Sequence, residues 1–153
     1  MTRKINAIVT GGSSGLGEAT VRKILEKGGN VSIFDTQEDK AKALSEEFGE
    51  ACTFFYTDVT NEKSINEALT SAISKYQFIN LLVNCAGIGI ASKVIGKEEL
   101  HDSNIFQKII NVNLVGTFNV LKLVTEKMIE NQLDEDNFRG VIINTASDRK
   151  SVV

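Results

Sequence analysis

The chain has 153 residues, of which 42% are hydrophobic and 24% are charged, and its formal net charge is -3 at pH 7. This composition is typical of one soluble domain with a single core, and it excludes a disordered or fibrous chain. The charge provides no basic field for nucleic acid or an anionic membrane surface, and no apolar run reaches the roughly 20 residues of a membrane-spanning helix. We expect an intracellular protein, mitochondrial or cytoplasmic, with no signal peptide and no nucleic-acid partner.

Apolar runs alternate with helical patterns along the whole chain. Five of these runs have the length, and several have the Val, Ile and Phe content, of strands buried on both faces. They lie at residues 5–10, 30–35, 52–57, 79–84 and 140–146. Because short links connect strand, helix and strand in this order, right-handed crossovers are favoured. The pattern therefore predicts an α/β fold with a doubly wound parallel sheet.

The first predicted strand leads directly into a glycine-rich turn, TGGSSGLG, at residues 10–17. Gly11, Gly15 and Gly17 permit a tight turn and let backbone amides approach a pyrophosphate at the N-terminus of the following helix. The Lys-Ser/Thr pair of a P-loop is missing, which disfavours an NTPase. The turn predicts a phosphate-binding loop, and the alternative is a plain connection between strand and helix.

Asp35 ends the second predicted strand, about 20 residues after the glycine turn. At that position a carboxylate accepts hydrogen bonds from both hydroxyl groups of an adenosine ribose. A 2′-phosphate on this ribose would be repelled by the carboxylate. The combination of turn and carboxylate therefore predicts NAD, rather than NADP, as the cofactor.

Two further helices are predicted in the first half of the chain, after the one that follows the glycine turn. The first is expected to be capped by Thr36, with Asp39 three residues later, and to end at Gly49. The second carries apolar residues on one face at helical spacing. These residues are Ile65, Ala68, Leu69, Ala72, Ile73 and Tyr76.

A longer helical stretch is predicted from Asp102 or Ser103 to about Ile129. Two asparagines and a glycine within Asn111–Gly116 are poor helix formers. We therefore expect a local break in this segment, which would expose a backbone carbonyl to water or a ligand.

The sequence contains no pattern for a metal site. Cys52 and Cys85 stand alone in apolar runs, without zinc spacing or a disulfide framework, and predict buried thiols in a reducing compartment. His101 lies in a charged stretch without a cluster of ligand residues. No metal cofactor is predicted.

Five motifs, in chain order, resemble those of the short-chain dehydrogenases/reductases. They are TGGSSGLG at 10–17, TDVT at 57–60, NCAG at 84–87, NVNLVGTF at 111–118 and IINTAS at 142–147. The resemblance covers nearly all of residues 5–147. It implies a Rossmann-like, three-layer α/β/α fold with five of the family's seven strands. Residues 1–147 would then form an incomplete NAD-binding domain.

The resemblance also implies which residues bind the cofactor. Asp35 would hold the adenosine ribose, and Asp58 and Val59 the adenine, whereas Asn84 fits a structural role equally well and is left out of the site. The other cofactor-binding residues are those of the glycine turn and of the segment after the fourth strand. These are Gly11, Ser14, Gly15, Leu16, Gly17, Cys85, Ala86 and Gly87.

By the same resemblance the enzyme transfers a hydride between NAD and a secondary alcohol or ketone. Asn113 would hold a water of the proton relay, and Ser147 would bind the substrate oxygen. The family's general acid/base tyrosine, with a lysine four residues later, is absent: Tyr56 and Tyr76 are the only tyrosines. The chain alone is therefore expected to be inactive.

The most similar subgroup of the family acts on 3-hydroxyacyl-CoA or hydroxysteroid substrates, and the complete protein is expected to be a homotetramer. The alternatives are a non-catalytic NAD-binding or sensing module and a shortened product with neither role. The family pattern stops after Ser147. Residues 148–153, DRKSVV, match the translation of a common sequencing adapter and are predicted to be a non-native tail.

Overall fold

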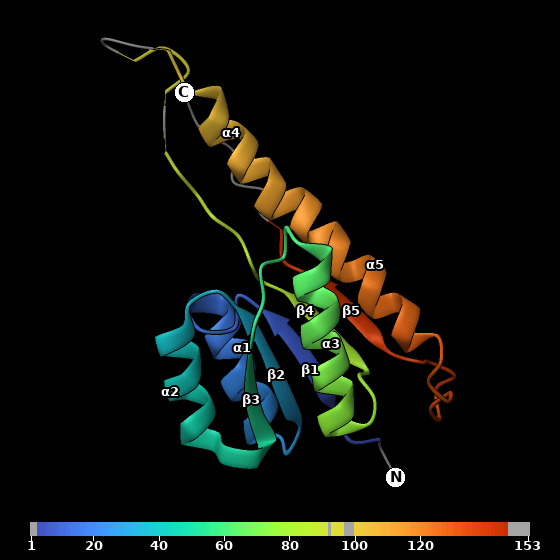
Figure 1. Cartoon of the computed structure of the whole chain (residues 1–153). Helices are drawn as coiled ribbons and strands as arrows, with labels where there is room; N and C mark the ends of the chain where they lie inside the picture. Colours follow the sequence, from blue (N-terminus) through green and yellow to red (C-terminus); the bar gives the residue numbers. More distant parts are fainter. Residues whose placement is uncertain (1–2, 92, 97–99, 147–153) are drawn as a thin grey trace.

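A computed structural model describes residues 3–91, 93–96 and 100–146 of the chain. Ser147 and residues 148–153 lie outside the described residues. Within the described part, five parallel strands form one sheet in the order β3-β2-β1-β4-β5 (Figure 1). The strands are β1 (Asn6–Thr10), β2 (Asn30–Asp35), β3 (Cys52–Tyr56), β4 (Leu81–Asn84) and β5 (Val141–Asn144). All five predicted strands are present, and the predicted doubly wound parallel sheet is confirmed.

Helices cover both faces of the sheet, which gives three layers (Figure 1). Helices α1 and α2 lie on one face, and α3 and α5 lie on the other. Successive residues of β1 point to opposite sides: Ala7 and Val9 join the core under α1 and α2, and Ile8 joins the core under α3 and α5. The helices are α1 (Gly15–Glu26), α2 (Glu38–Phe48), α3 (Glu62–Tyr76), α4 (Ser103–Ile110) and α5 (Thr117–Met128), with a short 3-10 turn, η1 (Gly49–Ala51).

The start of α2 differs from the prediction. The predicted cap at Thr36 is wrong, because α2 begins at Glu38 after Gln37 and no side chain caps it. Asp35 Oδ1 accepts a hydrogen bond from the Gln37 amide at 2.9 Å. Because this turn holds Gln37 outside the helix, the first helical residue is Glu38. The predicted end at Gly49 is confirmed, with a left-handed φ of 58°.

The predicted face of α3 is confirmed, and so is its burial. Ile65, Ala68, Leu69, Ala72 and Tyr76 are buried, and Ile73 packs on the same core while partly buried. Asn61 caps the helix by accepting hydrogen bonds from the amides of Lys63 and Ser64.

The long predicted helix is present, and the break within it is a π-helical segment. This segment, η2 (Asn111–Gly116), joins α4 to α5, and the three form one rod (Figure 1). Asp102 caps the rod by accepting a hydrogen bond from the Asn104 amide. Helix α5 packs on the sheet, whereas α4 buries none of its residues and extends past the sheet.

One buried hydroxyl has no partner among the described residues: Ser32 Oγ, in the middle of β2. Replacing Ser32 with alanine is expected to raise the free energy of unfolding by about 1 kcal/mol, because the unsatisfied hydroxyl is removed. Thr53 lies opposite Ser32 in the register of β2 and β3, and its hydroxyl bonds to the Tyr76 hydroxyl at 3.0 Å. Thr53→Val should therefore lower the free energy of unfolding, because it removes this hydrogen bond. Urea unfolding of both variants tests the two expectations, and a loss of stability in Ser32→Ala would contradict the first.

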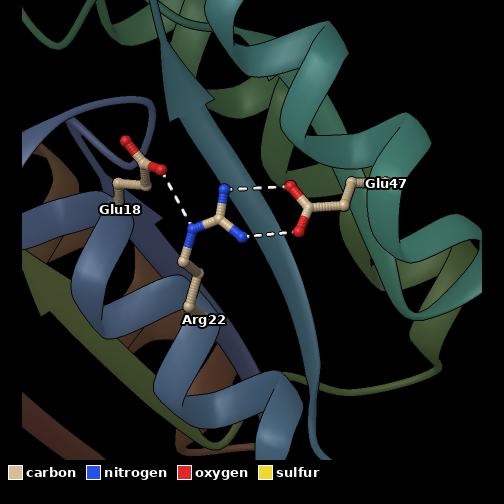
Figure 2. Close-up of polar contacts among 3 residues, drawn as sticks. All are labelled: Glu18, Arg22 and Glu47. Atoms are coloured by element: carbon tan, nitrogen blue, oxygen red, sulfur yellow. Dashed lines mark hydrogen bonds and ion pairs between the residues drawn. The ribbon is translucent and has the colours of Figure 1, made fainter.

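Arg22 joins α1 to α2 at the surface (Figure 2). Its guanidinium donates two hydrogen bonds to Glu47, at 2.6 and 2.9 Å, and one to Glu18 at 3.0 Å. The hydrogen bond from Arg22 holds the pKa of the Glu47 carboxyl below its ordinary value. Because the folded-state pKa is lowered, the stabilisation is present above the unfolded pKa of about 4.3 and is lost as pH falls through the folded pKa.

Glu47→Gln is therefore expected to lower the melting temperature at neutral pH, and this difference from the unmodified chain should shrink below about pH 4. Thermal unfolding between acid and neutral pH measures it. Glu46→Gln is the control, because Glu46 precedes Glu47 on α2 and makes no hydrogen bond to Arg22 in the described structure. A melting difference that stays constant down to the lowest pH would contradict the assignment.

Candidate functional site

A cavity of about 520 Å³ lies at the carboxyl ends of the central strands. Residues that follow β1, β2, β3 and β4 meet there, as expected where parallel strands end at one edge of a sheet. Ten of the eleven residues predicted to bind a cofactor line it, and Gly15 does not. The ten are Gly11, Ser14, Leu16, Gly17, Asp35, Asp58, Val59, Cys85, Ala86 and Gly87.

A larger hollow of about 890 Å³ lies at the opposite end of the strands, beside β5. It is lined by the segments around Arg3, Phe78 and Val141. Neither the glycine turn nor a carboxylate at a strand end reaches it. The smaller cavity is therefore the candidate site, because it combines both.

The glycine turn packs closely against its own backbone and against the backbone of the segment after β4. A methyl group on Gly17 would lie 2.0 Å from the carbonyl oxygen of Gly11, and one on Gly11 would lie 2.8 Å from the Cα of Ala86. Glycine is thus required at both positions by close approach of the backbone. This packing places the N-terminus of α1, whose first amides have no partner within the helix, at the cavity.

Two side chains of the turn face the cavity. Ser14 is the N-cap residue of α1, but its hydroxyl caps none of the helix amides. Leu16 is 74% exposed, so an apolar side chain lies at the mouth of the cavity. An anionic group at this helix start would meet free amides and the positive end of the helix dipole.

Asp35 ties β2 to the glycine turn. Its Oδ2 accepts hydrogen bonds from the amide of Ser13 at 3.0 Å and from its hydroxyl at 2.6 Å. Its Oδ1 accepts one from the amide of Gln37. The side chain is only 7% exposed, yet it lines the cavity. Sequence reasoning missed Ser13, whose only signal was its place inside the turn.

Asp58 and Val59 line the cavity beyond Asp35. Asp58 Oδ1 accepts hydrogen bonds from the amide and hydroxyl of Thr60, at 2.9 and 2.7 Å. Val59 is buried. Its carbonyl accepts a hydrogen bond from the Asn119 side chain, and its own side chain packs against Gly116 of η2.

The segment after β4 is held by Thr10, the last residue of β1. The Thr10 hydroxyl accepts hydrogen bonds from the amides of Cys85 and Ala86, both at 3.1 Å. It also lies 3.4 Å from Asn84 Oδ1, to which it donates. Asn84 is buried and donates to Asn144 of β5 at 2.9 Å, so its contacts are those of a structural residue.

Asn113 joins the π-helical segment to the loop after β4. Its Oδ1 accepts a hydrogen bond from the Ile88 amide at 2.8 Å, and its Nδ2 donates to the Ile88 carbonyl at 2.9 Å. Its own carbonyl accepts a bond from the Thr117 hydroxyl at 2.8 Å. Ser147, the other predicted catalytic residue, lies outside the described residues. Near the end of the described residues, the Thr145 amide donates to the Asn84 carbonyl at 3.1 Å.

The two cysteines differ in burial. Cys52 is buried as predicted, and burial raises the pKa of its thiol to about 11. Cys85 is only partly buried, so the prediction of a fully buried thiol is wrong there, because Cys85 lines the open cavity. Burial still raises the pKa of the Cys85 thiol, which therefore remains protonated at neutral pH.

Several residues that line the cavity were not predicted from the sequence. They are Phe34, Thr36, Gln37, Thr57, Ile88, Lys108 and Val112.

In the described ranges, no group of three or more His, Cys, Asp or Glu side chains could hold a metal ion. A search of the same ranges finds no helix with the length and apolarity needed to cross a membrane.

The strand order, the glycine turn between β1 and α1, and the carboxylate at the end of β2 define a Rossmann-like α/β domain. Such domains bind dinucleotides at the carboxyl ends of their strands. The chain belongs to the short chain dehydrogenase family, because the family model matches residues 5–152. The resemblance drawn from the five sequence motifs is confirmed.

Individual relatives agree with this assignment. The 3-hydroxyacyl-CoA dehydrogenase type-2 of Bos taurus is 43% identical over 143 residues, which are 92% of this chain and 55% of that protein. The chain thus spans about half the length of the curated relatives it matches.

Two solved structures are also similar. The crystal structure of 3-hydroxyacyl-CoA dehydrogenase type-2 from Mycobacterium avium has a TM-score of 0.86 at 36% identity and covers 94% of this chain and 57% of its own. The 3-ketoacyl-(acyl-carrier-protein) reductase from Brucella melitensis, complexed with NADH, has a TM-score of 0.82 at 30% identity, with the same coverage.

Proposed function

We propose that this chain forms the cofactor-binding part of an NAD-dependent oxidoreductase that transfers a hydride between NAD and a secondary alcohol or ketone. The observation that carries the proposal is the shared cavity of the glycine turn and Asp35. The free amides at the start of α1 suit a pyrophosphate. NAD supplies the hydride acceptor of the reaction when it is bound.

The residues of the cavity fit this cofactor. Gly11, Ser14, Leu16 and Gly17 would hold the phosphates, and Asp35 the adenosine ribose. Three of the roughly four lone-pair sites of this carboxylate are already used, two on Oδ2 and one on Oδ1, so Oδ1 keeps the capacity to accept a hydrogen bond from the ribose. Asp58 and Val59 would hold the adenine, and Cys85, Ala86 and Gly87 would lie beside the nicotinamide half. Gly15, which does not line the cavity, would permit the backbone conformation of the turn.

The proposed substrate is a 3-hydroxyacyl-CoA or a hydroxysteroid, and the similarity to a 3-hydroxyacyl-CoA dehydrogenase type-2 supports the first of these. Asn113 would fix the loop after β4 through Ile88, and Ser147 would bind the substrate oxygen. We further propose that the chain alone does not turn over, because neither Tyr56 nor Tyr76 has a lysine four residues later.

The alternative of a stand-alone NAD-binding module is less well supported. In the described part of the chain, β5 pairs only with β4, and its residues Val141 and Ile143 are 50% and 48% exposed. A stand-alone module would be expected to cover or charge such an apolar edge. The exposed edge therefore favours the oxidoreductase.

A homotetramer is proposed for the whole protein. Supporting it, the rod of α4, η2 and α5 leaves large apolar side chains exposed, with Phe106 at 61%. The others are Ile110, Leu114, Val115 and Phe118. Exposed apolar surface of this kind is typical of a protein interface.

Titration of the purified chain with NADH, followed by NADH fluorescence, tests the proposed function. Saturable binding is expected, with NADPH at least about tenfold weaker because its 2′-phosphate meets Asp35. No saturable signal up to millimolar NADH would overturn the proposal. With NAD and a 3-hydroxyacyl-CoA, the chain alone should form no NADH.

A further inference from the structure

The candidate cofactor cavity continues into a second hollow of about 340 Å³, which we term the polar annexe. The two share Asp58, Lys108 and Val112 as lining residues. The other polar residues of the annexe come from the loop after β3, from α4 and from η2, and they are Thr60, Asn104, Gln107 and Asn111. The annexe therefore lies between the β3–α3 loop and the rod, next to the part of the cavity proposed for adenine.

The chemistry of Asp58 sets the direction in which adenine would face. Thr60 occupies Asp58 Oδ1, and no hydrogen bond reaches Oδ2 from the residues that the structure describes. An ionised carboxylate only accepts hydrogen bonds, and the exocyclic donor of adenine is its 6-amino group. The 6-amino edge would thus face Asp58, and the annexe would lie beyond it.

We propose that the annexe is an extension of the cofactor site that accepts a substituent on the adenine 6-amino group, and that a substituent ending in a carboxylate binds best. The proposal rests on the proposed function, because it requires the dinucleotide to bind in the cavity. A singly substituted 6-amino group keeps one N–H, so its hydrogen bond to Asp58 is retained.

Lys108 determines the preference for a carboxylate. It is exposed, it lines both hollows, and within the described residues it forms no ion pair. Asp58 is the anion of the annexe and keeps its charge when hydrogen-bonded, but the end of a substituent would lie beyond the 6-amino group, where the long, flexible Lys108 side chain can approach it more closely than Asp58 can. The amide groups of Asn104 and Gln107 add donors for a carboxylate. An ammonium group on the substituent would instead meet Lys108 as a like charge.

The experiment compares NADH with N6-(2-carboxyethyl)-NADH and N6-(2-aminoethyl)-NADH on the same chain. Both derivatives are expected to bind within about tenfold of NADH, and the carboxyethyl derivative about threefold more tightly than the aminoethyl one, as for an exposed ion pair. Lys108→Met should remove this threefold ratio. Because the readout is a ratio of two dissociation constants, a general loss of affinity in the variant cancels.

Lys40→Met is the matched control, since Lys40 is an exposed lysine on α2 that lines neither hollow. The threefold ratio should survive this substitution. If NADH binds and both derivatives bind more than tenfold more weakly, the annexe is closed to substituents and the inference is overturned while the proposed function stands. A ratio that persists in Lys108→Met overturns the role of Lys108. Failure of NADH itself to bind overturns both.

Discussion

Replacing Gly17 with alanine is expected to abolish NADH binding and to lower the free energy of unfolding by about 3 kcal/mol. The added methyl group would lie 2.0 Å from the carbonyl oxygen of Gly11 and 2.7 Å from its carbonyl carbon. Both are backbone atoms of the residue that follows β1, so the contact is relieved only by moving the turn away from α1. Urea unfolding and NADH titration measure the two effects.

Gly15→Ala is the matched control for this prediction. A methyl group at Gly15 would meet no atom within 4 Å, although the φ of 54° is unfavourable for alanine. Its expected cost is about 1 kcal/mol, from backbone strain alone. If Gly17→Ala were no more destabilising than Gly15→Ala, the close packing of the turn would not be what requires glycine at position 17.

Asp35→Ala is expected to have the second large effect, on both stability and cofactor preference. The substitution leaves the amide and hydroxyl of Ser13 without their acceptor in a buried place, and it frees the amide of Gln37. The expected loss of stability is about 2–3 kcal/mol. NADH should bind more weakly, because the ribose hydroxyls lose their acceptor. The ratio of NADPH to NADH affinity should rise, because the repelling charge is gone.

Unfolding by urea and paired titrations with NADH and NADPH measure these changes. Asp39→Ala is the control, since Asp39 is an exposed carboxylate on the first turn of α2 and lines no part of the cavity. It should leave both quantities nearly unchanged. An unchanged NADPH-to-NADH ratio in Asp35→Ala would contradict the role of Asp35 in cofactor choice.

The sheet could be predicted from the sequence because its strands are buried on both faces. Continuous apolar runs, such as those of β1 and β2, carry that signal directly. The buried face of α3 could also be predicted, because its apolar residues recur at helical spacing. The start of α2 could not be predicted, because Asp35 competes for the backbone at Gln37 and a capping pattern does not reveal this.

The candidate site was predictable only in part. Its glycines and carboxylates stand in recognisable patterns, but its positioning contacts join residues far apart in the chain. Ser13 meets Asp35 across 22 residues, and Asn113 meets Ile88 across 25. Such pairs depend on how the elements pack, so no local pattern indicates them. The polar annexe is a further example, since α4 supplies part of it across the loop after β4.

The π-helical segment has a consequence for how the rod divides its surface. A π turn holds about one residue more than an α turn, and one residue corresponds to a rotation of about 100° around the helix axis. The segment therefore introduces a phase offset between α4 and α5. The stripe of Val120, Val124 and Met128 on α5 is buried against the sheet, while α4 buries none of its residues. Deleting one residue within η2 is expected to remove this offset and to turn Asn113 away from Ile88.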